Sequence, residues 1–343
     1  MFWYGIFIVI IIFSIVIQQN FTLKFKLSTP IFSLIAIFFV LLIVLRPSTL
    51  PDYGSYYDFY TRSNLNHESF EFFSHIIRII SPGWYFFLFI FALLSISLKL
   101  YAIKLNTDKH ILAILTYIST SFVLHDFIQI RVSCAIGIIW VALYYLTRRK
   151  ILIYLILISL ASLFHVSSMV FFPMVILKAD KINKFFWFLL IVLSYLLAIF
   201  NIDLIGLFLS LLKFDNHIIN KVTIYYKLAQ DLKVTHGYVN IFAVNQLIKI
   251  IIFVLVLIKF HKFDKNKILL IKIYTIGICV LPIFSNVSAI SLRFSELLTS
   301  VIVFILPDLF SLFKNKMYGY LAYLLLISCS FFLNVLYPNY FNV

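Results

Sequence analysis

The sequence has few charged residues: they make up 12% of the chain, whereas a soluble domain usually carries about 25%. Hydrophobic residues account for 63%, and the mean hydropathy is +1.06. No water-soluble fold can cover that much apolar surface, so the composition excludes a soluble globular protein. Lipid is therefore the expected solvent for most of the chain, which predicts an all-α, polytopic helix bundle in a membrane.

The usual signatures of metal and nucleotide chemistry are also missing. The three cysteines, Cys134, Cys279 and Cys329, lie in apolar runs without metal-ligand spacing. The predicted outer loops contain no Asp-x-Asp, and the chain contains no glycine-rich phosphate loop. We therefore expect no metal site and no cofactor.

Acidic residues are scarce, so the formal net charge is +15. In a soluble protein this charge would suggest nucleic acid as the partner, but in a membrane protein the topology of the basic loops explains it first. No RNA- or DNA-binding module is recognisable, so we expect no nucleic-acid partner.

Apolar runs separated by basic connectors predict about twelve membrane-embedded helices in a single membrane domain, residues 1–343. The positive-inside rule places the connectors, among them Lys99–Lys109, in the cytoplasm and both chain ends outside. The helices are predicted near residues 2–19, 28–45, 82–104, 110–124, 128–147, 151–164, 166–177, 185–200, 238–259, 268–286, 294–313 and 318–337.

Two outer segments, residues 46–81 and 201–237, are long, and the second is expected to hold short amphipathic helices. The predicted helices 151–164 and 166–177 are unusually short, because about 13 residues at 1.5 Å each reach only about 20 Å. We expect them to form a re-entrant hairpin whose tip, residues 164–168, ends inside the bilayer.

Arginine and lysine are distributed differently along the chain. The predicted cytoplasmic connectors use mostly lysine, whereas five of the seven arginines lie at or near the predicted outer face. Because the guanidinium fork suits phosphate and carboxylate, an outer anionic ligand such as phosphate or pyrophosphate is a hypothesis. The alternative is that these arginines pair with carboxylates such as Asp52, Asp58 and Asp126 or reach the head groups. The five are Arg46, Arg62, Arg78, Arg131 and Arg293.

Arg131 and Arg293 are expected about one turn inside apolar helices, where ionisable residues are costly and therefore functional candidates. Glu296 follows Arg293 on the same helical face and is either a ligand contact or its neutralising partner. His165, beside Ser167, is a candidate for proton transfer because the pKa of histidine lies near neutrality. A hydrogen-bonded histidine of the bundle is the simpler alternative.

Several short motifs occur in order between residues 46 and 300, and all lie on the predicted outer side. Together they resemble the EpsG branch of the Wzy-type polysaccharide polymerases. In that family an acidic residue often precedes the Pro-Gly-aromatic motif, and here the position is Ser81, so no role of that carboxylate is carried over. The motifs are Arg46, Asp52-Tyr53 with Tyr56, Ser81-Pro82-Gly83-Trp84, Gln129-Ile130-Arg131 with Ala135, His165-Val166-Ser167-Ser168, and Arg293.

The resemblance implies a membrane glycosyltransferase of the bacterial cytoplasmic membrane. Such an enzyme joins polyprenyl-pyrophosphate-linked oligosaccharide repeat units on the outer face into an exopolysaccharide, O-antigen or capsule. A flippase and a chain-length regulator are then the expected protein partners.

The site roles follow from this chemistry. Arg131 and Arg293 are predicted to stabilise the leaving pyrophosphate without a metal, with Arg46 as a third arginine. His165 is the first candidate for the group that accepts the proton of the attacking hydroxyl, and Asp52 is the second. The predicted substrate-binding residues are Arg46, Tyr53, Tyr56, Gln129, Ser167 and Glu296.

Three other functions are open at this stage. A flippase or other transporter of lipid-linked sugars also needs outer arginines, but it is expected to place polar groups through the full membrane depth. The predicted cytoplasmic helix halves contain few, chiefly Lys249 and Lys272. An O-acetyltransferase of surface glycans and a purely structural membrane subunit are the remaining alternatives.

Overall fold

The computed structural model confirms the all-α class: within the residues that it describes, all regular structure is helical. The helix predicted near residues 2–19 and Arg62 lie outside those residues. The structure describes residues 29–61, 72–179, 182–211, 220, 222–224, 226–228, 239–260, 263–309 and 313–337.

Five helical segments are long and apolar enough to cross a membrane. A sixth is counted if α14 (Ser288–Thr299) and α15 (Ile302–Leu309) form one broken span. About twelve spans are thus not confirmed, because the other apolar helices of the described part have only 10–17 residues. The five are α5 (Trp84–Asn106), α6 (His110–Tyr117) with η1 (Ile118–Ile128), α7 (Ile130–Thr147), α13 (Lys265–Ile283), and α16 (Lys316–Phe331) with η5 (Phe332–Leu336).

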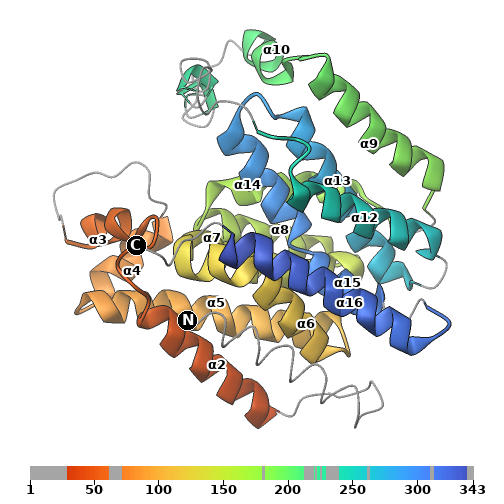
Figure 1. Ribbon diagram of the computed structural model, residues 1–343. Coiled ribbons are helices and arrows are strands. Elements are labelled where there is room, and N and C mark those ends of the chain that lie inside the picture. Colours follow the sequence, from red (N-terminus) through yellow and green to blue (C-terminus); the bar gives the residue numbers. More distant parts are fainter. Residues whose placement is uncertain are drawn as a thin grey trace. The chain divides into compact units, whose positions relative to one another are not determined.

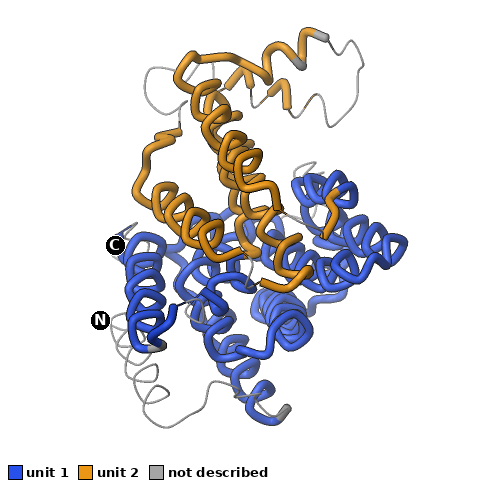
Figure 2. Tube along the Cα trace, turned by 90° about the vertical axis from the view of Figure 1, so that its right-hand side faces the viewer, with its two compact units in different colours: residues 1–176, 302–343 blue, residues 177–301 orange. Residues whose placement is uncertain are grey.

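The chain divides into two compact units, which Figure 2 distinguishes by colour. Unit 1 contains residues 1–176 and 302–343, and unit 2 contains residues 177–301. The single membrane domain of residues 1–343, and the side of the membrane on which each loop lies, stay predictions.

In unit 1, α5 packs against α2 (Thr29–Val44) and α7 (Figure 1). The α5–α7 approach is close at Gly137, where an added Cβ would lie 2.9 Å from Leu98 Cβ. Fully buried Trp140 on α7 packs edge-on against Phe304 of α15. Large apolar side chains thus fill the centre of this unit.

The short predicted helices at 151–164 and 166–177 are present as α8 (Ile151–Ser162) and the 3-10 helix η2 (Val166–Ile176). They pack against each other, and Tyr154 Oη donates a hydrogen bond of 2.5 Å to the carbonyl of Phe171. This is the hairpin that the sequence predicts, and its depth in the bilayer stays a prediction.

Unit 2 is built around α13, which packs against α9 (Lys184–Ile199), α12 (Val244–Ile258) and α14. Gly277 lets α14 come close, since a Cβ there would lie 2.9 Å from the backbone nitrogen of Thr299. The predicted outer segment 201–237 contributes α10 (Leu204–Leu211), in agreement with a short helix at that place.

Two details of the predicted topology are wrong. Lys99 is not a connector residue, because α5 continues to Asn106 and buries this side chain completely. The helix predicted near residues 294–313 begins earlier, at Ser288, so Arg293 lies more than one turn inside α14, in agreement with the position expected for this residue.

Candidate functional site

Arg46 lies just after α2 and is 5% exposed. Its Nη1 donates a 2.8 Å hydrogen bond to the carbonyl of Phe127, the residue before the last of η1. Its Nε and Nη2 are buried and have no hydrogen-bond partner among the described residues. Buried donors are normally satisfied, so two nitrogens of a buried cation, which carry three N–H bonds, are available to an anionic ligand.

Two tyrosines of α3 (Tyr53–Thr61) cover the Arg46 guanidinium. Arg46 Cζ lies 5.4 Å from the ring centroid of Tyr53 and 5.8 Å from that of Tyr56. Burial lowers the pKa of Arg46 to about 10, and the nearby Tyr56, Tyr53 and Asp52 oppose that shift. Arg46 therefore keeps its positive charge at neutral pH.

Arg131 lies in the first turn of α7 and contacts the same tyrosine. Its Cζ is 5.6 Å from the ring centroid of Tyr56, and its Nε is 3.5 Å from the Tyr56 hydroxyl oxygen. The structure thus brings together four of the predicted site residues, Arg46, Tyr53, Tyr56 and Arg131. Two cations around one tyrosine make an electropositive site at the start of a helix, where the helix dipole also favours an anion.

The turn before α3 explains how the tyrosines reach Arg46. Asp52 has φ 63°, in the left-handed region, so the chain reverses sharply between α2 and α3. The Asp52 carbonyl then accepts the backbone N–H of Tyr56 at 3.1 Å. Tyr53 and Tyr56 are three residues apart and therefore share one face of α3. Asp52 itself is exposed.

An aromatic cluster, Tyr53, Tyr57 and Trp84, adjoins Arg46. Trp84, the first residue of α5, donates from Nε1 to the Tyr53 hydroxyl at 2.8 Å. The Trp84 ring lies 5.3 Å from those of both Tyr53 and Tyr57. Tyr57 is 45% exposed. Sequence reasoning missed Tyr57, although its spacing of four residues from Tyr53 places both on one helical face.

His165 lies in the turn between α8 and η2 and is buried. The backbone N–H of Phe73, in α4 (Phe72–Ile80), donates to the carbonyl of Leu163 at 3.2 Å, so α4 packs on this turn. His165 is close enough to His125 of η1 to interact electrostatically, and the Gln129 side chain is hydrogen-bonded to His125. The predicted residues His165 and Gln129 thus share one neighbour.

The remaining predicted residues are placed as follows. Ser167 lies half-buried in the first turn of η2. Arg293 and Glu296 lie on α14 in unit 2, where Arg293 is exposed and Glu296 is half-buried. Glu296 interacts electrostatically with Lys249 of α12 and with Arg293. Arg131 and Arg293 therefore belong to different units.

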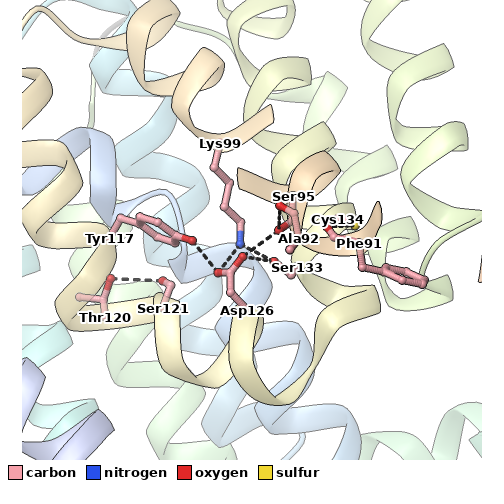
Figure 3. Close-up of polar contacts among 10 residues, drawn as sticks. All are labelled: Phe91, Ala92, Ser95, Lys99, Tyr117, Thr120, Ser121, Asp126, Ser133 and Cys134. Carbon is pink, nitrogen blue, oxygen red and sulfur yellow. Dashed lines mark hydrogen bonds and ion pairs between the residues drawn. The ribbon is translucent and has the colours of Figure 1, made fainter. Parts of the chain in front are cut away.

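Sequence reasoning missed a buried polar network in unit 1, drawn in Figure 3. Lys99 Nζ and Asp126 Oδ2 form an ion pair at 2.7 Å, with both side chains 0% exposed. Tyr117 Oη donates to the same oxygen at 2.6 Å. Ser95 and Ser133 both donate to Asp126 Oδ1. Asp126 thus pairs with Lys99 and not with Arg46, Arg78 or Arg131. The sequence does contain a signal for this network, because Lys99 and Asp126 are ionisable residues within apolar runs.

Comparison with known protein families shows to which family the chain belongs. The model of the EpsG family matches residues 29–342. The chain belongs to the EpsG family. The matched range includes every candidate residue of this EpsG-family protein in both units. Comparison with curated proteins and with solved structures found no match.

No group of three or more His, Cys, Asp or Glu residues in the described part of the chain is placed to hold a metal ion. The groups that do converge are two arginines and several tyrosines, which bind anions and ring-shaped ligands.

Proposed function

We propose that this EpsG-family protein is a membrane glycosyltransferase that polymerises polyprenyl-pyrophosphate-linked oligosaccharide repeat units. It does so on the outer face of the bacterial cytoplasmic membrane and forms a surface polysaccharide such as an exopolysaccharide, O-antigen or capsule. Membership of the EpsG family supports a membrane polysaccharide polymerase in general. The observation that carries the finer proposal is Arg46, a buried cation beside Tyr56 and Arg131 whose Nε and Nη2 have no hydrogen-bond partner in the described part of the chain.

The reaction needs a cation where negative charge develops. A hydroxyl oxygen of one repeat unit attacks the anomeric carbon of the other, and the bond from that carbon to the pyrophosphate oxygen breaks. The electron pair leaves with the polyprenyl pyrophosphate, so donors aimed at its oxygens lower the barrier. Arg46 and Arg131 supply those donors in unit 1, and Arg293 is the proposed third arginine. No metal is required for this stabilisation.

The attacking hydroxyl loses a proton during the reaction. His165 is the proposed acceptor, because its imidazole is buried in the turn before η2 and a neutral imidazole can accept a proton. Asp52, exposed at the start of α3, is the second candidate and otherwise orients a sugar hydroxyl. Gln129, Ser167 and Glu296 are proposed substrate contacts.

The aromatic cluster suits the glycan. A sugar ring packs its C–H face on an aromatic ring, and Tyr53 lies next to both Arg46 and Trp84. A pyrophosphate on Arg46 would therefore place its attached sugar near Tyr53, Tyr57 and Trp84. The aromatic cluster is thus placed to contact the sugar, and the neighbouring Arg46 is placed to contact the pyrophosphate.

The test replaces Arg46 and Arg131 singly by alanine in cells that lack the native protein. Arg148→Ala is the matched control, because Arg148 also lies over a tyrosine, 3.4 Å from the ring centroid of Tyr144, but at the opposite end of α7. With equal membrane abundance, we expect single lipid-linked repeat units to accumulate in both site variants and long chains in the control. Long chains in all three variants would contradict the proposal.

A flippase of lipid-linked oligosaccharide is the second candidate, favoured by the Lys99–Asp126 pair, which places charge deep inside an apolar helix. Both candidates predict loss of long chains. They differ in where the single units accumulate: on the outer face for a polymerase and on the cytoplasmic face for a flippase.

A further inference from the structure

The Lys99–Asp126 network ties together three helical segments of unit 1 (Figure 3). The Asp126 carboxylate accepts hydrogen bonds from Ser95 Oγ at 3.0 Å and from Lys99 Nζ at 2.7 Å, both on α5. It also accepts hydrogen bonds from Tyr117 Oη, at the end of α6, and from Ser133 Oγ, on α7. Each carboxylate oxygen thus accepts two donors, which leaves this buried anion little freedom to move.

The network borders the candidate anion site. Asp126 immediately precedes Phe127, whose carbonyl accepts Arg46 Nη1 at 2.8 Å. Ser133 follows Arg131 by two residues in α7. The same carboxylate therefore holds the segment that binds Arg46 and the helix that carries Arg131.

One residue of the chain between these two attachments is not helical. Gln129 has φ −102° and ψ 64°, and it separates η1 from α7. Backbone hydrogen bonds of 3.0 Å tie Gln129 to both segments, one from its N–H to the Leu124 carbonyl and one from the Ser133 N–H to its own carbonyl. A side-chain contact between the two segments restricts their relative orientation further. The bond from Ser133 to Asp126 is such a contact, and Lys99 reinforces it by donating to Ser133 Oγ at 2.7 Å.

We propose that the Lys99–Asp126 network positions Arg46 and Arg131 for one ligand by holding η1 and α7 together across Gln129. Asp126, Lys99 and Ser133 are then positioning residues that touch no substrate. This inference rests on the proposed function, because it requires that Arg46 and Arg131 bind the pyrophosphate group.

The test compares the donors of Asp126, with inorganic pyrophosphate as the probe and the full-length protein in lipid nanodiscs. Ser133→Ala removes the bond that crosses Gln129. Ser95→Ala and Tyr117→Phe are matched controls, because each removes one donor to the same carboxylate from a segment other than α7. Pyrophosphate affinity and the unfolding temperature are measured for all three variants and for the unchanged protein.

We expect Ser133→Ala to weaken pyrophosphate binding by about tenfold, as loss of a partner that orients a ligating group typically does. The two controls should bind close to the unchanged protein. A purely structural role predicts instead that affinity falls in step with unfolding temperature across the three variants, and that result would overturn the inference.

A double variant covers the case in which single changes to the ion pair prevent folding. Lys99→Met with Asp126→Leu replaces the pair by apolar side chains, which is often tolerated. We expect it to fold and to bind pyrophosphate weakly; full affinity would overturn the inference. If the unchanged protein does not bind pyrophosphate at all, the anion site of the proposed function fails, whereas equal binding by all variants refutes only the positioning role.

Discussion

Unit 1 buries two cations in opposite ways. Lys99 is 0% exposed, and its ammonium is paired with Asp126 and bonded to Ser133. Arg46 is 5% exposed and donates to one carbonyl, while its Nε and Nη2 have no partner among the described residues. A buried cation with its own carboxylate holds helices together, whereas one without a carboxylate is prepared for an anion from outside.

The largest effect on stability should come from breaking the Lys99–Asp126 ion pair. Asp126→Ala leaves the Lys99 charge buried without a counter-ion, which costs about 3–5 kcal/mol. We expect the variant to be lost from the membrane, and its abundance measures this. Lys99→Met with Asp126→Leu is the control, and failure of this double variant to restore abundance would show that the pair is needed for more than charge balance.

The opposite behaviour is expected at the other cation. Arg46→Met removes a buried charge that forms no ion pair with a carboxylate of the described residues, so the thermal stability should fall little while pyrophosphate binding is lost. Arg46→Lys should also bind poorly, because an ammonium lacks the planar fork. Calorimetry and thermal unfolding of the purified variants check both statements; a large loss of stability with retained binding would reverse the roles of the two cations.

A moderate effect on stability is expected at the contact between α5 and α7, two of the helices that the Lys99–Asp126 network joins. Gly137→Ala puts a Cβ 2.9 Å from Leu98 Cβ, and overpacking of this kind costs about 1–3 kcal/mol. Gly54→Ala is the matched control, because nothing lies within 4 Å of an added Cβ there. Thermal unfolding of the two variants compares them, and equal stabilities would mean that α5 and α7 separate without cost.

The smallest effect on stability is expected at the aromatic cluster. Tyr57 is 45% exposed, so Tyr57→Leu should change the free energy of unfolding by less than about 0.5 kcal/mol. We expect shorter glycan chains nevertheless, because the ring is proposed to hold a sugar. Tyr85→Leu, at a residue that is 64% exposed, is the control for interfacial tyrosines in general. The same shortening in both variants would remove the special role of Tyr57.

Much of the helical pattern followed from hydropathy alone. The helix predicted at 128–147 is α7 (Ile130–Thr147). The two short helices after residue 150 were also predicted, and their shortness was the reason to expect a hairpin. The number of spans was not predictable in this way, because apolar runs of 10–17 residues also occur as helices too short to cross a bilayer.

The residue types of the candidate site were predictable, but their contacts were not. An arginine in an apolar run is costly, which singled out Arg131. Its neighbour Tyr56 and the position of Arg46 depend on how α2, α3 and α7 pack, and no local pattern gives that. Lys99 was taken for a loop marker because its partner, Asp126, lies on another helix.

The most direct test reconstitutes the purified protein in vesicles with polyprenyl-pyrophosphate-linked repeat units and a metal chelator. We predict a ladder of lengthening glycans with release of polyprenyl pyrophosphate, absent with Arg46→Ala and retained with Arg148→Ala. No ladder from the unchanged protein, or an undiminished ladder from Arg46→Ala, would contradict the account.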